Sequence, residues 1–166
     1  KLEGLPLSDF EKSVISDLKL SRKIYTTQDH HLRIQLMKSN VLKHYEELVT
    51  GKSLFKYGGI HSGKGESPLG GYDIGNLVSN LADGNFQSSL HIMIIGKSGM
   101  QGVPFKGLSP QPVNPDSKDL KFLKSFFNET TGSDWALFDL QQIRKGAKKN
   151  KIAIEGNSLQ NMLAGY

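Results

Sequence analysis

Apolar residues return at helical spacing in the first third of the chain. Ser8 and Glu11 have the Ser-x-x-Glu spacing of a capping box, which predicts a short helix from Ser8 to about Leu20. A longer helix is predicted from near Thr27 to about Val49, because apolar residues return every three or four positions along one side of it. The residues on this apolar side are Ile34, Met37, Val41, Tyr45 and Leu48.

Three further helices are predicted from their caps and their apolar spacing. Asp73 is expected to be the N-cap of a helix whose apolar residues follow at i, i+3, i+4 and i+7. Another helix is expected to begin after Asp116 or Ser117. A last short helix is expected to follow Asn157-Ser158 and to stop at Gly165-Tyr166.

Apolar stretches of strand length lie between these helices, at Ser53–Tyr57, Ser89–Ile95 and Asp134–Leu140. Alternating helices and apolar strands are typical of an α/β fold, in which helices flank a parallel or mixed sheet. Three strands are few for so many helices, and no strand follows the last helix. We therefore expect residues 1–166 to form a single but incomplete α/β domain.

Composition narrows the class of protein. A hydrophobic content of 37% and a charged content of 22% are typical of a globular domain, and no apolar run reaches the length of a transmembrane helix. The basic run Arg144–Lys151 contains no aromatic residue, which favours a solvated surface turn over a nucleic-acid site. Since the chain has no cysteine, disulfides and thiolate metal sites are excluded. Any targeting signal is expected upstream of Lys1.

The strongest candidate for chemistry is the turn Gly-Gly-Ile-His, residues 58–61, which follows the first predicted strand. Ligands of open α/β sheets bind beyond the carboxyl ends of the strands, so Gly58 and Gly59 are expected to line a ligand site. His61 can act there as a general base or as a metal ligand, whereas the alternative is a hydrogen-bonded turn histidine. A phosphate loop ending at Lys64 is not favoured, because Gly65 stands where that motif needs Ser or Thr.

A second candidate group lies on the long predicted helix. Arg33, Met37, Asn40 and His44 share one stripe, and this stripe adjoins the apolar side. Arg33 and Asn40 are therefore expected to be partly buried and to need partners, which could be an anionic ligand or a catalytic carboxylate. The alternative is a structural salt bridge or a helix edge in solvent. A short connection should place the start of this helix beside the end of the following strand, so Arg33 is expected to point toward His61.

These residues together resemble the back half of a known domain. Arg33, Met37 and Asn40, followed by Leu54 to His61, are similar to the erythromycin esterase-like, ChaN-like and Tiki/TraB group of α/β proteins. That group carries two G-x-x-H motifs and an arginine-containing helix before the second motif, and residues 58–61 match the second motif. The resemblance runs roughly from Leu32 to Tyr166 and includes residues 135–144, although glutamines stand there in place of an arginine and a proline.

The resemblance implies a function and a missing part. No first G-x-x-H motif precedes Arg33, so the N-terminal half of the domain would lie outside this chain, which alone should be inactive. Members of the group hydrolyse esters, act as metal-dependent proteases or bind haem as lipoproteins. The resemblance thus implies a hydrolase-like domain, in which His61 activates water or holds a divalent metal and Arg33 stabilises anionic charge. Asn40 and His44 are expected to contact the ligand.

Two other functions stay open. The first is a non-enzymatic protein that binds haem or another small ligand, with the loop Gly96–Pro115 as a lid. The second is a structural or interaction domain in which His61 only packs. The resemblance also favours an extracytoplasmic location, as a secreted protein or a lipoprotein.

Overall fold

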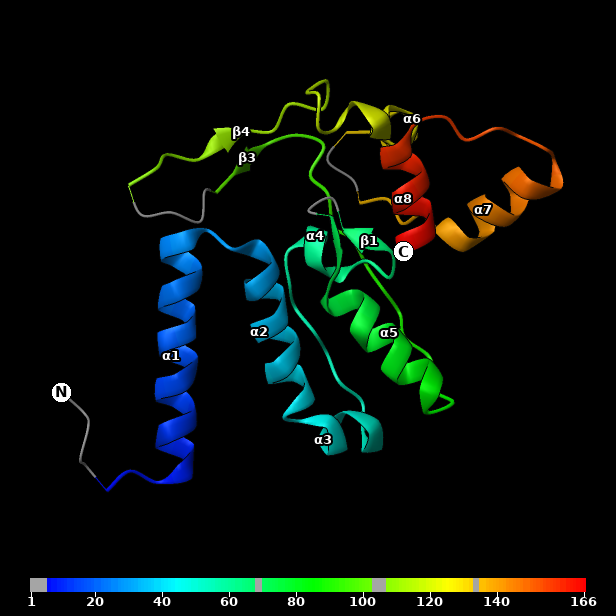
Figure 1. Cartoon of the computed structure of the whole chain (residues 1–166). Helices are drawn as coiled ribbons and strands as arrows, with labels where there is room; N and C mark the ends of the chain where they lie inside the picture. The colour runs from blue at the N-terminus through cyan, green and yellow to red at the C-terminus, as the bar shows by residue number, and fades with distance from the viewer. Residues whose placement is uncertain (1–5, 68–69, 103–106, 133–134) are drawn as a thin grey trace. The chain divides into compact units, whose positions relative to one another are not determined.

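The computed structural model describes residues 6–67, 70–102, 107–132 and 135–166 (Figure 1). Contacts group the chain into two compact units. The first unit comprises Lys1–Ser62 and Glu66–Ser89, and the second comprises Gly63–Gly65 and Leu90–Tyr166. That both belong to one larger domain stays a prediction.

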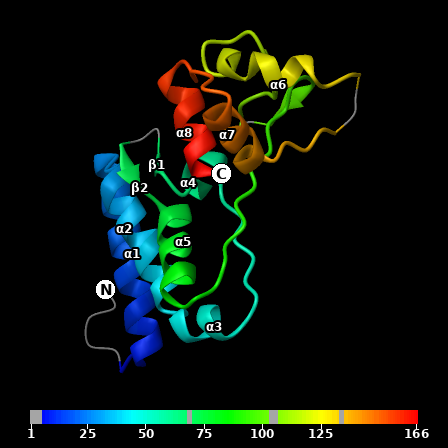
Figure 2. The same ribbon diagram turned by 90° about the vertical axis from the view of Figure 1, so that its right-hand side faces the viewer.

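The first unit is built mainly from helices. α1 lies beside α2, α2 contacts α5, and the short α4 also contacts α5, as the two views show (Figures 1 and 2). β1 and β2 form a two-stranded antiparallel pair next to α5. The bounds are α1 Asp9–Thr27, α2 His30–Leu42, α3 Tyr45–Thr50, α4 Gly59–Ser62, β1 Glu66–Ser67, β2 Gly71–Tyr72 and α5 Ile74–Gly84.

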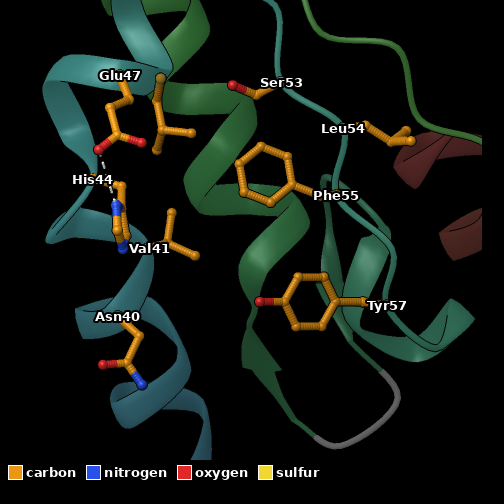
Figure 3. Close-up of a pocket in the computed structure, with 9 residues that line it drawn as sticks. Asn40, Val41, His44, Glu47, Ser53, Leu54, Phe55 and Tyr57 are labelled. Carbon is orange, nitrogen blue, oxygen red and sulfur yellow. Dashed lines mark hydrogen bonds and ion pairs between the residues drawn. The ribbon is translucent and has the colours of Figure 1, made fainter.

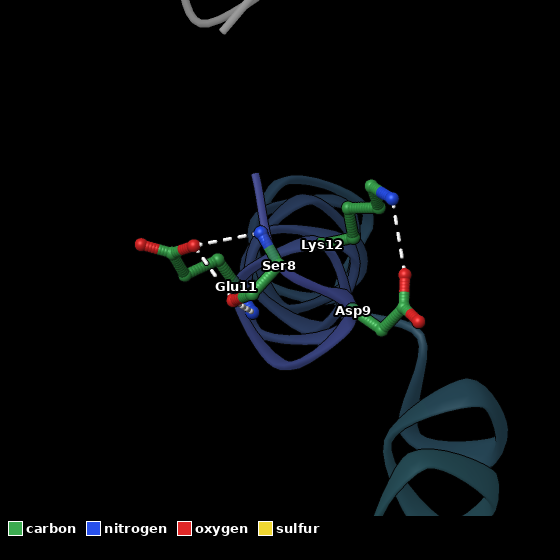
Figure 4. A network of polar contacts seen from close by, with 4 residues as sticks. All are labelled: Ser8, Asp9, Glu11 and Lys12. Carbon is green, nitrogen blue, oxygen red and sulfur yellow. Dashed lines mark hydrogen bonds and ion pairs between the residues drawn. The ribbon is translucent and has the colours of Figure 1, made fainter. Parts of the chain in front are cut away.

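Local capping signals explain where these helices begin. The predicted capping box of α1 is confirmed, since Ser8 Oγ accepts from the N–H of Glu11 and the Glu11 carboxylate accepts from the N–H of Ser8 at 2.8 Å (Figure 4). α1 continues beyond the predicted end at Leu20 and stops where Gln28 adopts a left-handed φ of 53°. Asp73 caps α5, as predicted, by accepting from the N–H of Ile74.

The long helix predicted from Thr27 to Val49 is wrong. Gln28 ends α1, and Asp29 starts a new helix because its side chain accepts from the N–H of Leu32 at 2.9 Å. α2 then ends at Leu42, and α3 begins at Tyr45. The predicted apolar side is nevertheless inside in part, since Ile34 and Val41 are buried with Ile24 of α1 and Ile74 of α5.

The second unit has its own core. Leu123, Phe127, Met162 and Leu163 are buried together, so that α8 packs on the segment around α6. The predicted last helix is confirmed as α8, whereas the helix predicted after Asp116 or Ser117 begins later, as a 3₁₀ turn that leads into α6. The bounds are β3 Met100–Gln101, β4 Gln111–Pro112, the 3₁₀ turn Lys121–Leu123, α6 Lys124–Asn128, α7 Leu140–Lys149 and α8 Asn157–Gly165.

The predicted α/β fold with a parallel or mixed sheet is wrong. Of the residues that the structure describes, 52% are helical, and the described strands form two antiparallel pairs of two strands each. None of the three predicted strands forms among the described residues, and residue 134 of the third lies outside them. Leu54, Leu90 and Trp135, one in each predicted strand, are at least 85% exposed. A local apolar run indicates a preference for extended backbone, but a strand also needs a hydrogen-bonded partner that no local pattern encodes.

The basic run from Arg144 to Lys151 is a helix for most of its length. It lies in α7, so the predicted turn is wrong, while the predicted solvation is confirmed by the exposure of its lysines. α7 begins at its N-cap Asp139, whose side chain accepts from the backbone N–H groups of Gln141 and Gln142.

The capping box predicts a pH dependence for the first turn of α1. The Ser8 hydroxyl and then the Ser8 backbone N–H lower the pKa of Glu11 below its ordinary value of 4.5, because both donate to its ionised carboxylate. A lowered folded-state pKa stabilises the helix above the unfolded value, and this contribution is lost as the pH falls through the folded value. We therefore expect the amides of Glu11 and Lys12 to lose protection below about pH 4.5, measured as the exchange rate relative to the intrinsic rate at the same pH. In Glu11→Gln the protection should show no such acid dependence.

Candidate functional site

The candidate site is centred on a buried pair, His61 and Asp73, in the first unit. His61 belongs to α4, not to the end of a strand, and its backbone N–H donates to the carbonyl of Gly58 at 2.9 Å. Its ring Nδ1 lies 2.7 Å from Asp73 Oδ2. His61 is 8% exposed and Asp73 is 1% exposed, so this is a buried charge-assisted contact.

Each oxygen of the Asp73 carboxylate has its own partner. Oδ1 accepts from the N–H of Ile74 at 2.7 Å and thereby caps α5, while Oδ2 faces His61. An ionised carboxylate can only accept hydrogen bonds, so Nδ1 of His61 must carry the proton that it shares with Asp73. A neutral ring with its proton on Nδ1 has a free lone pair on Nε2.

Nε2 is the open nitrogen of the His61 ring. It has no hydrogen-bond partner within the described part of the chain, where every fully buried side-chain nitrogen or oxygen atom does have one. Nε2 therefore cannot be fully buried, which agrees with the 11% exposure of the His61 side chain. The pair therefore has one oriented ring nitrogen, Nε2, that no described protein group occupies, backed by a buried carboxylate.

Sequence reasoning missed the role of Asp73. The residue was predicted only as the N-cap of a helix, and that part is confirmed. Its contact with His61 joins residues twelve positions apart across a turn and the β1–β2 pair. No spacing rule links such positions. The sequence therefore indicates that Asp73 caps a helix, but it does not indicate that the other carboxylate oxygen contacts His61.

Arg33 is placed differently from the prediction. It lies in the first turn of α2, and its side chain is exposed, so the expected partial burial is wrong. The strand that should have delivered His61 beside the start of this helix is not formed. Without this strand there is no geometric reason to expect Arg33 beside His61. Their cooperation stays a prediction.

Asn40 and His44 line a hollow of about 470 Å³ that neither His61 nor Arg33 lines (Figure 3). Asn40 is exposed, contrary to the expected partial burial, and its Oδ1 accepts from Lys43 Nζ at 2.8 Å. His44 Nδ1 lies 3.3 Å from Glu47 Oε1.

The rings of Phe55 and Tyr57 extend from the opposite wall of the hollow toward α2 and α3, while Leu54 points away (Figure 3). The wall therefore shows the two-residue alternation of extended backbone, although no strand forms there. The structure thus divides the predicted ligand residues between this hollow and the His61–Asp73 pair. Gly58 and Gly59 are exposed beside His61 in the sequence and do not line the hollow.

The described residues offer a metal few ligands. Within them, no group of three or more His, Asp or Glu side chains is arranged to hold an ion. The predicted metal at His61 would therefore find one open nitrogen there, whereas protein zinc sites use three or four side-chain ligands. A search of the described helices for a bilayer-spanning segment, long and apolar throughout, finds none.

The resemblance to the erythromycin esterase-like, ChaN-like and Tiki/TraB group rests on short motifs. The arginine of that group's helix corresponds to Arg33, which is exposed on α2. The group's second G-x-x-H motif corresponds to residues 58–61, which form α4 and the residue before it. Membership of that group stays a prediction, because comparison of the chain with models of known families, with characterised proteins and with solved structures found no match.

Proposed function

We propose that the protein is a hydrolase in which His61 acts as a general base on a water molecule and Asp73 orients it. The observation that carries the proposal is the 2.7 Å contact between His61 Nδ1 and the buried Asp73 carboxylate. A carboxylate behind a histidine fixes the tautomer and the ring orientation, and it stabilises the imidazolium that forms when the histidine takes a proton.

The proposed step is the hydrolysis of an ester. Water attacks the carbonyl carbon while Nε2 of His61 removes its proton, and a tetrahedral intermediate forms. The resulting imidazolium then gives this proton to the leaving alkoxide as the ester carbon–oxygen bond breaks. The Nδ1 proton stays on His61 and Asp73 accepts its hydrogen bond in each step, so Asp73 is a positioning residue and His61 is the catalytic residue.

Two further considerations support a hydrolase. The G-x-x-H motif at residues 58–61 resembles one of a group that includes esterases, although that resemblance also implies a second motif outside this chain. The small exposed part of the His61 side chain suits access by water. Arg33 is left out of the mechanism because its side chain is exposed on α2.

The proposal is tested by measuring hydrolysis of small activated esters by the complete protein, with and without EDTA. We expect turnover that EDTA does not reduce. Asp73→Asn should lower kcat by at least about tenfold at an unchanged KM, because the amide has one oxygen where the carboxylate has two. If that oxygen caps α5, the amide NH2 faces Nδ1 and cannot accept from it. Absence of turnover on every ester, loss of turnover with EDTA, or an unchanged kcat in Asp73→Asn would contradict the proposal.

Binding of a small ligand without catalysis is the second candidate, and the hollow lined by His44, Phe55 and Tyr57 favours it. Pockets that bind small molecules combine aromatic walls with a few polar groups. Titration of the complete protein with haem tests the version in which the ligand is haem. A haem absorption band that disappears in His44→Ala would support binding in the hollow, whereas no band would contradict it.

A further inference from the structure

We propose that the second unit docks on an anionic phospholipid surface through residues 135–152, here called the docking segment. It comprises α7 with the residues directly before and after that helix. The inference is independent of the proposed hydrolase and rests on exposed charge and exposed apolar side chains within one short stretch.

The charge of the docking segment is of one sign over its helical part. Residues 140–154 contain five basic residues and no acidic residue. Lys145, Lys148, Lys149 and Lys151 are exposed, and none of them forms an ion pair within the part of the chain that the structure describes. Clustered, unpaired lysines attract anionic lipid headgroups.

α7 has two distinct sides. Leu140 and Ala147 are half-buried on one side, and α7 contacts α8, with Arg144 Nη1 donating to the carbonyl of Leu163 at 3.1 Å. At 100° per residue, Lys145 and Lys149 fall on the side away from Leu140 and Ala147. Packing on α8 therefore fixes the helix with its lysines outward.

Exposed apolar side chains flank the lysines on both sides in the sequence. Trp135 is 87% exposed and Leu137 is 92% exposed before α7, and Ile152 is 61% exposed after it. Phe138, which follows Leu137, packs edge-on against Phe126 with ring centroids 5.0 Å apart. This contact anchors the segment, while Trp135 and Leu137 stay outside the core. Tryptophan, leucine and lysine together are the residues of interfacial membrane-binding segments.

The apolar residues of the docking segment decide between two partners that lysines could bind, a lipid surface and a nucleic acid. Lysines alone serve either partner, because both carry phosphates. Leu137 and Ile152, however, would bury aliphatic area in the headgroup and acyl boundary of a bilayer, whereas aliphatic side chains gain little along a phosphate backbone. The combination therefore favours the lipid surface.

Trp135 makes the proposal directly measurable, because it is the only tryptophan of the chain. We expect its fluorescence to shift to the blue when the complete chain meets vesicles of phosphatidylcholine mixed with phosphatidylserine. Vesicles of phosphatidylcholine alone should give little shift. High salt should reverse the shift, since the attraction between lysines and headgroups is screened.

Two variants with the same change of charge sharpen the test. In Lys145→Gln/Lys148→Gln/Lys149→Gln, affinity for the anionic vesicles should fall by about 100-fold or more. The matched control, Lys19→Gln/Arg22→Gln/Lys23→Gln, removes exposed charges from α1 and should bind as the wild-type chain does. Circular dichroism reports whether each variant is folded.

Several outcomes would overturn the proposal. These are the absence of a shift with anionic vesicles, an equal shift with both kinds of vesicle, and equal weakening in both variants. Binding to a DNA duplex without binding to vesicles would also overturn it. The salt dependence of the wild-type chain tests the proposal even if a variant fails to fold.

Discussion

Replacing His61 with glutamine is expected to lower kcat/KM for ester hydrolysis by about 100- to 10,000-fold, the usual contribution of a general base. Glutamine keeps polar atoms near Asp73 but has no nitrogen that can take a proton from water at neutral pH. The measurement is steady-state hydrolysis of the best ester by the wild-type and variant proteins at equal concentration, with circular dichroism as the check on folding.

A second histidine gives the matched control for this experiment. His31 lies in the first turn of α2 and is exposed, so His31→Gln should leave kcat/KM unchanged. If His61→Gln retains the wild-type rate while folded, His61 is a structural histidine, and the proposed mechanism is wrong. The same holds if both variants lose activity equally.

Asp73→Ala is expected to cost about 2–5 kcal/mol of unfolding free energy, because it removes a buried hydrogen bond to a charged group and the N-cap of α5 together. The substitution leaves Nδ1 of His61 and the N–H of Ile74 without their acceptor in a region where Asp73 and Ile74 are each 1% exposed. Urea unfolding followed by circular dichroism measures the change.

The control for this substitution lies on the same helix. Asp83 is exposed near the end of α5, and Asp83→Ala should change the unfolding free energy by no more than about 0.5 kcal/mol. A cost below about 1 kcal/mol for Asp73→Ala would mean that the buried pair contributes no more than a typical neutral hydrogen bond, contrary to its geometry.

Capping signals in the sequence predicted the beginnings of α1 and α5 correctly. Ser8 with Glu11 and Asp73 all cap the helices expected of them, because a cap depends only on residues within one turn. The long helix failed for a local reason as well. The Asp29 side chain accepts from a backbone N–H and starts a new helix there. Because apolar residues recur at helical spacing after Asp29 as well as before it, the pattern gives no sign that one helix ends and another begins.

The sheet could not be predicted from the same information. Ser53–Tyr57 and Ser89–Ile95 have the composition of strands, yet a strand requires a partner far away in the sequence, and periodicity carries no record of that partner. The error propagated to the site. Arg33 was placed near His61 by a helix–strand geometry that needed both the long helix and the strand.

The site itself was predicted in part. The sequence predicts that His61 lies in a turn that begins with two glycines. In the structure His61 lies in the short helix α4, and its backbone N–H donates to the carbonyl of Gly58. Its burial and its carboxylate partner depend on α5 packing against α4, which is a tertiary contact that local sequence patterns do not encode. Asn40 and His44 came together in one hollow because they lie on one stripe of a helix and the turn after it.

The central claim is that Asp73 orients His61 with Nε2 free. Its most direct test is to determine which ring nitrogen of His61 carries the proton. Long-range ¹H–¹⁵N correlation spectra of the neutral imidazole distinguish its two tautomers, and His61→Gln assigns the signals. We predict that His61 has its proton on Nδ1 and that Asp73→Asn changes this tautomer or mixes the two. A His61 ring that has its proton on Nε2, with signals unaffected by Asp73→Asn, would contradict the account.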